Sequence, residues 1–404
     1  MEQAVIKQLL QQKIFANKAS HTFNPYSQQV LQKLAGCHTA KLGKHVYGCT
    51  NCGHRHTQYH SCGNRHCPNC GGLKREQWLL DRESELLPTT YFHIVFTLPQ
   101  QLRSLAMGNR KSVFNLLFEA STYTLRKLGN DTKYLGGVPG IISVLHTNGQ
   151  DLTFHPHVHC IVSGGGLSKE GKWQAEKRKN GHFLFPRRAM EKIFKMYFLE
   201  QLQSLFFSEK LQVEDENLFT KTIQEVRYIK WNVYAKRPFG GPKQVIEYLG
   251  RYTHKVAITT HRIKEITEEK ITFRYKDYKD GNKQKEMTLS NEEFLRRFEQ
   301  HILPKGFVKI RHSGFLSHQN KGERLAKICE QLNISAPPAK VQLPVSVLAA
   351  MRYGVDITQC PQCKTGKLEL IATYINVAKE GICLVNAATL RNRGSPIKIP
   401  KPVL

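Results

Sequence analysis

The sequence predicts an α+β protein in which a cysteine-rich module precedes a larger sheet-forming region. The first observation is that apolar, β-branched segments typical of strands share the chain with longer segments of helical spacing. Strands are predicted at 91–98, 140–145 and 158–162, and helices at 100–107, 111–128 and 187–207. The second observation is that six cysteines fall between residues 37 and 70. A segment this rich in thiols is typical of a metal-binding module.

Composition restricts the class of partner. The 404 residues include 60 Lys and Arg against 32 Asp and Glu, a formal net charge of +28. Such a surplus favours a polyanionic partner, and nucleic acid before membrane. The sequence contains neither a run of about 18 apolar residues nor a basic amphipathic helix, the two features that a membrane role would predict. The N-terminal residues lack the apolar core of a signal peptide, so we expect a cytoplasmic protein.

The N-terminal part divides into two predicted segments, a helical one over 1–36 and a zinc-binding one over 37–87. Cys49 and Cys52 form one Cys-x2-Cys turn, and Cys67 and Cys70 form another fourteen residues later. Each turn presents two thiolates, and two turns complete the tetrahedron that structural zinc requires. We therefore expect these four cysteines to bind one Zn²⁺. Three further residues could hold a second zinc ion: Cys37, Cys62 and His66.

Three histidines, His155, His157 and His159, alternate along one predicted strand. Side chains on a strand alternate between faces, so His157 and His159 point the same way. Two neutral imidazoles at this spacing can chelate a divalent metal, but a lone His-x-His is as often an ordinary pair at a strand edge. The motif alone leaves both interpretations open.

A second chemically active segment is predicted on a helix that begins near Pro242. Tyr248 and Tyr252 are four residues apart and therefore lie on one helix face. Two such tyrosines are usually part of an amphipathic stripe. Their neighbours here are basic, including Arg251 and Lys255, which weakens that interpretation.

The C-terminal region, 305–404, carries Cys360 and Cys363, which form half of a zinc site. This pair could belong to a partial zinc ribbon or to a simple turn. The last residues, from 391 onward, are basic and rich in proline, so we expect a mobile tail.

Four motifs in order resemble a known family. They are the segments 61–70, 149–159, 234–242 and 248–254, written SCGNRHCPNC, GQDLTFHPHVH, YAKRPFGGP and YLGRYTH. Together they resemble the two-tyrosine rolling-circle transposases of insertion sequence family ninety-one, which are HUH (His-hydrophobic-His) endonucleases. The resemblance extends over about 35–320. It implies an HUH nuclease domain at 88–304, with a central, mainly antiparallel sheet flanked by helices, and a bacterial, nucleoid-associated protein.

The resemblance also implies a mechanism. His157 and His159 would hold Mg²⁺ or Mn²⁺, with Gln150 as the expected third ligand. A hydroxyl of Tyr248 or Tyr252 would attack single-stranded DNA at a transposon end and form a covalent 5′-phosphotyrosine, which a 3′-hydroxyl later displaces to rejoin the end or join target DNA. The expected DNA contacts are Lys236, Arg237, Arg251 and Lys255.

Two other functions compete with this prediction. A non-catalytic zinc-finger DNA-binding protein would use the histidines only for structure. A histidine-triad nucleotide hydrolase would explain the alternating histidines, but not the zinc module, the tyrosine helix or the net charge. Cleavage of single-stranded DNA that depends on metal separates the transposase from the non-catalytic alternative.

Overall fold

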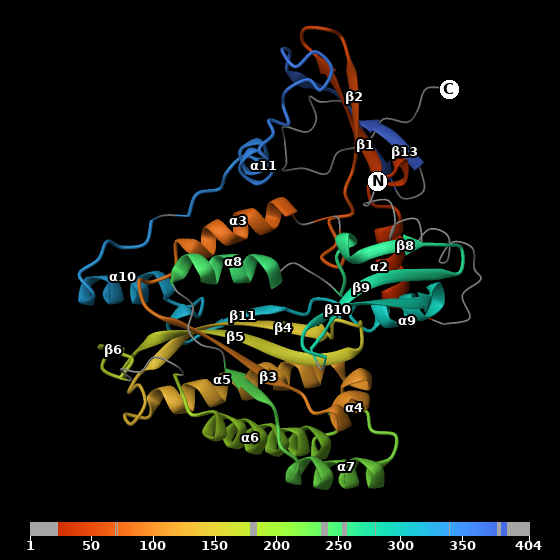
Figure 1. Cartoon of the computed structure of the whole chain (residues 1–404). Helices are drawn as coiled ribbons and strands as arrows, with labels where there is room; N and C mark the ends of the chain where they lie inside the picture. The colour runs from red at the N-terminus through yellow and green to blue at the C-terminus, as the bar shows by residue number, and fades with distance from the viewer. Residues whose placement is uncertain are drawn as a thin grey trace. The chain divides into compact units, whose positions relative to one another are not determined.

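The structure is a computed structural model that describes residues 23–68, 70, 72–177, 184–235, 241–252, 257–278, 280–338, 340–377 and 381–385 (Figure 1). The chain forms two compact units. The first comprises 1–77, 265–270 and 342–404, and the second comprises 78–264 and 271–341. This division differs from the four consecutive segments expected from the sequence, because strands from both ends of the chain share one sheet.

The sheet of the first unit has the order β13-β12-β1-β2. It consists of β1 (Gly43–Cys49), β2 (Arg55–Tyr59), β12 (Leu368–Val377) and β13 (Gly381–Val385). All neighbours are antiparallel, and the register of β1 on β12 places Cys49 opposite Leu368. The unit also contains α2 (Pro25–Ala35), which Asn24 caps, the 3₁₀ turn η1 (Ala40–Leu42) and α11 (Val345–Tyr353). The C-terminal strands are therefore an integral part of the cysteine-rich module.

The second unit is built on a sheet of order β11-β4-β5-β3-β7, in which β6 also pairs with β5. Its strands are β3 (Tyr91–Thr97), β4 (Val138–Asn148), β5 (Phe154–Leu167), β6 (Trp173–Ala175), β7 (Val233–Ala235) and β11 (Ile310–Ser313). Every pairing is antiparallel, so the expected mainly antiparallel sheet is confirmed. The strands predicted around 140–145 and 158–162 are present, and both are longer than expected.

Helices cover both faces of this sheet (Figure 1). One face packs on α5 (Arg110–Asn130) and α6 (Arg187–Phe207), and an aromatic core that includes Phe96, Phe194 and Trp231 fills the space between them. The opposite face packs against α8 (Pro242–Tyr252) and α10 (Lys321–Gln331) through a smaller cluster. Because β5 alternates, Val158 and Cys160 point into the large core while His157 and His159 point toward the face covered by α8.

The remaining elements complete the described part of the chain. They are the 3₁₀ turns η2 (Gln100–Leu102), η3 (Thr260–Arg262) and η4 (Gly314–Leu316), the helices α3 (Gly72–Glu83), α4 (Arg103–Gly108), α7 (Glu216–Tyr228) and α9 (Asn291–Glu299), and the three-stranded sheet β8 (Ile263–Ile266), β9 (Lys270–Asp277) and β10 (Lys283–Ser290). The Ser290 hydroxyl accepts a hydrogen bond from the Glu293 amide and caps α9. Within the described residues no helix is both long and apolar enough to cross a lipid bilayer.

Candidate active site

Three histidines on neighbouring strands converge on the face covered by α8. His157 and His159 are alternate residues of β5, and the register of β4 places His146 directly opposite His157. One ring nitrogen of each of the three lies within 4.8 Å of the others. Nitrogens at about 2.1 Å from one ion are separated by about 3 to 4 Å, so small side-chain rotations would let all three bind the same metal.

The environment of His157 keeps it in the form that binds metal. Its Nδ1 donates a hydrogen bond to the His155 carbonyl at 2.6 Å, so the lone pair lies on Nε2. Burial lowers the pKa of His157 to about 4, and the imidazole is therefore neutral at pH 7. A neutral ring with its other nitrogen oriented by a carbonyl is the usual arrangement of a metal-binding histidine.

Tyr248 contacts this cluster from α8. Its hydroxyl lies 2.7 Å from Nδ1 of His159 and 2.8 Å from Nε2 of His93 on β3, and those two nitrogens are themselves 2.8 Å apart. The His93 and His159 rings stack at 5.1 Å with an interplanar angle of 5°. Val245, one helical turn earlier, is fully buried and anchors α8 so that Tyr248 faces the histidines.

The sequence did not identify His93 as a site residue, because it lies within an apolar strand typical of a protein core. It is 2% exposed, and the register of β3 on β5 pairs Val95 with His159. His93 is two residues from Val95 and therefore lies on the same face of the sheet. The available signal was a histidine within an otherwise apolar strand, since a buried polar group requires a partner.

The third member of the histidine cluster is His146 and not the expected Gln150. Gln150 lies two residues beyond the end of β4, where its side-chain amide is 3.5 Å from the Tyr278 hydroxyl and its carbonyl accepts from Arg262. The reason is the length of the strand. Because β4 continues to Asn148, the position opposite His157 belongs to His146, and Gln150 lies in the connecting turn.

His155 lies next to the cluster and interacts with Arg103 of α4. The Arg103 guanidinium donates to Nδ1 of His155 at 2.5 Å, and burial lowers the His155 pKa to about 4. Arg103 therefore holds a positive charge at the edge of the histidine cluster, beside a neutral ring.

Several expected site residues fall outside the described part of the chain. Lys236, Arg237 and Lys255 are not described. Arg251 and Tyr252 belong to α8, but their side chains are not described. The second tyrosine and the four expected DNA contacts therefore stay predictions.

Eight cysteines of the first unit form two clusters, and their grouping differs from the expected zinc site and from the second ion that the sequence left open. Cys67 and Cys70 lie with Cys37 and Cys62. The sulfur–sulfur distances are 3.3 Å for Cys37 and Cys70, 3.6 Å for Cys62 and Cys70, and 3.7 Å for Cys37 and Cys67. Four sulfurs at about 2.3 Å from one ion in a tetrahedron are about 3.8 Å apart, so the cluster fits Zn²⁺. His66 is not a member of this cluster, and its Nδ1 lies 3.0 Å from the Asn64 side-chain oxygen.

The second cluster joins Cys49 and Cys52 to Cys360 and Cys363 from the other end of the chain. The sulfurs of Cys49 and Cys363 are 3.6 Å apart, and those of Cys52 and Cys360 are 3.8 Å apart. A hydrogen bond from Thr365, followed by backbone amides, lowers the Cys363 pKa to about 5 and favours its thiolate.

Close packing around the second cluster depends on Gly366. A Cβ at this position would collide with the sulfur of Cys49, so only glycine leaves room for the thiolate. The pairing of these two Cys-x2-Cys turns replaces the expected pairing of Cys49 and Cys52 with Cys67 and Cys70. The antiparallel alignment of β1 and β12 is the cause, because it places the end of β1 at Cys49 beside the start of β12 at Leu368.

Comparison with known proteins places the chain in a family. Residues 140–324 match a family described as "Putative transposase", and residues 6–98 match one described as "Transposase zinc-binding domain". The chain is 42% identical over 382 residues to the "Putative transposase y4qJ" of Sinorhizobium fredii (strain NBRC 101917 / NGR234), which covers 91% of this chain and 95% of the relative.

A second relative has a more specific name. The chain is 31% identical over 343 residues to the "Transposase for insertion sequence element IS801" of Pseudomonas savastanoi pv. phaseolicola, covering 83% of this chain and 81% of the relative. A solved structure, the metal-bound conjugative relaxase TrwC in complex with oriT DNA, aligns with a TM-score of 0.23 and 15% identity over 29% of this chain and 44% of that chain. On the strength of the two sequence relatives and the two family matches, the chain belongs to the insertion-sequence transposases of the IS91 and IS801 type.

Proposed function

We propose that this transposase cuts and rejoins single-stranded DNA at the ends of its insertion sequence, with Tyr248 as the nucleophile. The observation that carries the proposal is the contact of the Tyr248 hydroxyl with His159, which is also a member of the three-histidine cluster. A nucleophile beside a metal-binding group can reach a phosphate bound to that metal.

His146, His157 and His159 would hold a divalent ion, Mg²⁺ or Mn²⁺. When bound, the ion polarises a phosphoryl oxygen and orients the phosphate for in-line attack. Three imidazole nitrogens suit Mn²⁺ better than Mg²⁺, which prefers oxygen ligands. We therefore expect Mn²⁺ to support cleavage at lower concentrations than Mg²⁺.

The residues of the chain position the reacting groups and move the proton. The Tyr248 oxygen forms a bond to phosphorus while the bond from phosphorus to the 3′-oxygen breaks. The products are a 5′-phosphotyrosine and a free 3′-hydroxyl, and the bond energy is retained for rejoining. Nε2 of His93, 2.8 Å from the hydroxyl, is within reach of the tyrosine proton. Arg103 supplies a positive charge beside the cluster for the phosphate.

A second round of cleavage would use Tyr252, which follows Tyr248 by four residues on α8. Two nucleophiles on one helix would allow one strand end to stay covalently bound while another is cut. Zinc in the two cysteine clusters would hold the first unit together, and its basic residues would contribute to DNA binding.

The test uses single-stranded oligonucleotides from the ends of the element, incubated with protein and Mn²⁺. A label on the DNA 3′ end should migrate with the protein on a denaturing gel, because the tyrosine keeps the 5′-phosphate of the downstream fragment. A label on the 5′ end should appear in a shorter free strand.

The matched control is Tyr228→Phe, at an exposed tyrosine on α7. Tyr248→Phe should abolish the first adduct, whereas the control should cleave as the wild type does. An adduct of undiminished amount in a Tyr248→Phe/Tyr252→Phe double variant would exclude the tyrosine mechanism. Binding without any cleavage under all metal conditions would favour the non-catalytic alternative.

A further inference from the structure

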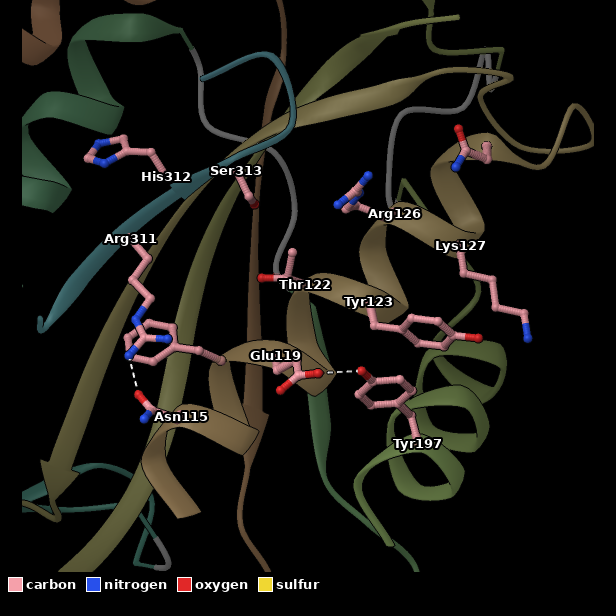
Figure 2. A pocket seen from close by; sticks show the side chains of 12 residues that line it. Asn115, Glu119, Thr122, Tyr123, Arg126, Lys127, Tyr197, Arg311, His312 and Ser313 are labelled. Carbon is pink, nitrogen blue, oxygen red and sulfur yellow. Dashed lines mark hydrogen bonds between the residues drawn. The ribbon is translucent and has the colours of Figure 1, made fainter. Parts of the chain in front are cut away.

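A cavity of about 770 Å³ opens on the α5 side of the second unit, opposite the face that carries the three-histidine cluster. Its walls come from α5, from α6 and from β11, the end strand of the described sheet. Figure 2 shows Arg311 and Ser313 on the side of β11 that faces α5, whereas the ring of His312 points away. This cavity is therefore separate from the Tyr248 site, although both belong to the same sheet.

Two tyrosines form a flat aromatic wall in this cavity. The rings of Tyr123 on α5 and Tyr197 on α6 stack at 4.1 Å with an interplanar angle of 19°. The Tyr197 hydroxyl donates a hydrogen bond of 2.6 Å to Glu119, which holds the pair in place (Figure 2). Tyr123 is 38% exposed, so part of its ring remains accessible for a further planar group.

Cations surround the aromatic wall. Arg126 and Lys127 on α5 are exposed, and the Lys127 ammonium lies 5.6 Å from the centre of the Tyr123 ring. The Arg311 guanidinium lies 4.2 Å above the Phe118 ring and bonds the Asn115 side chain, so its position is fixed. The lining thus contains three permanent cations and one carboxylate, Glu119, whose oxygen already accepts from Tyr197.

An aromatic platform with fixed cations beside it is the arrangement that binds single-stranded nucleic acid. Bases stack on aromatic rings regardless of sequence, and arginine and lysine bind the phosphates. Nine of the twelve lining residues are polar or charged and the other three are aromatic, and this combination suits a partner that is both planar and anionic. The chemistry therefore favours a nucleotide unit, which combines a planar base with an anionic phosphate.

We propose that this cavity binds an unpaired nucleotide of the DNA substrate at a distance from the cleaved phosphate. The base stacks on Tyr123, and the phosphate lies between Arg126 and Arg311. The proposal deepens the proposed function, because it takes single-stranded DNA as the substrate. A strand held on this face and cut on the other passes round the β11 edge, so the cavity sets which part of the strand reaches Tyr248.

The test measures binding of a fluorescent single-stranded oligonucleotide by anisotropy, in a full-length Tyr248→Phe background that prevents covalent capture. Tyr123→Ala should weaken binding about tenfold, within the range for loss of one base–aromatic stack. Tyr123→Phe keeps the ring and should bind within about twofold of the parent. This pair separates loss of stacking from a general effect on the fold.

Charge is tested with Arg126→Glu against the matched control Lys221→Glu, an exposed lysine on α7 outside the cavity. The first should weaken binding by about tenfold or more, whereas the control should change it much less. An oligonucleotide carrying 5-iodouracil should crosslink to Tyr123 on irradiation.

Two results would overturn the proposal. One is equal binding by Tyr123→Ala, Tyr123→Phe and the parent, with crosslinks elsewhere. The other is a result in which the same substitutions weaken binding of a free mononucleotide but leave binding of the oligonucleotide unchanged. Failure of the proposed function is distinguishable: crosslinking at Tyr123 without any Tyr248 adduct would leave the cavity assignment intact and remove the cleavage assignment.

Discussion

Replacing Cys363 with serine should remove one of two zinc ions and release the C-terminal strands from the first unit. The chain forms two four-cysteine clusters, so the wild type should contain two zinc ions. Serine cannot supply the thiolate, and three remaining ligands would hold the ion far more weakly. Cys363→Ser should therefore contain one zinc ion, bound by Cys37, Cys62, Cys67 and Cys70.

The energetic effect follows from the length of chain that the cluster closes. Cys49 and Cys363 are 314 residues apart in sequence. The loop-entropy relation for a cross-link evaluates to about 6 kcal/mol at this separation. The first cluster spans at most 33 residues, and the same relation evaluates to about 4 kcal/mol. Loss of the second cluster should therefore cost more stability than loss of the first, and it should weaken the docking of β12 and β13.

The assay combines elemental analysis of zinc with hydrogen exchange of residues 368–385. Cys363→Ser should halve the zinc content and raise exchange in β12 and β13. Cys383→Ser is the matched control, because Cys383 lies on β13 but belongs to neither described cluster. One zinc ion in the wild type together with an unchanged content in Cys363→Ser would refute the two-cluster arrangement and favour the expected site of Cys49, Cys52, Cys67 and Cys70.

Three further predictions concern the second unit. His146→Ala should lower adduct formation by about 100-fold or more at limiting Mn²⁺, because metal affinity depends on the number of ligands. Gln150→Ala should form the adduct within about threefold of the wild type, and the reverse order of effects would contradict the assignment of His146. His93→Gln should slow the chemical step about 100-fold with little change in DNA binding, as loss of a proton acceptor does, and an unchanged single-turnover rate would exclude that role. His301, fully buried between Thr147 and the Leu152 carbonyl, has a pKa lowered by burial from 6.5 to about 4. Its neutral form therefore stabilises the folded protein above pH 6.5, and this contribution of about 3 kcal/mol is lost as pH falls toward 4. In urea unfolding, His301→Gln should lose less stability between pH 7 and pH 4 than the wild type does, and an equal loss would contradict this role of His301.

Local patterns determined much of this protein from the sequence alone. Alternation along one strand placed His157 and His159 on the same face, and the structure has them there. The two-residue spacing of each cysteine pair identified the Cys-x2-Cys turns, and helical spacing around Pro242 predicted the helix that carries Tyr248. Each of these features depends on residues within a few positions of one another, where strand, turn or helix geometry decides the outcome.

Only the tertiary structure decided which of these features belong together. His146 replaced Gln150 because β4 extends to Asn148 and the strand register places His146 opposite His157. Cys360 and Cys363 joined Cys49 and Cys52 because β12 pairs with β1 across most of the chain length. His93 met Tyr248 because β3 lies beside β5 and α8 crosses the same face. The physical reason is common to all three: strand order and register are set by burial of the whole sheet, and no local spacing carries that information.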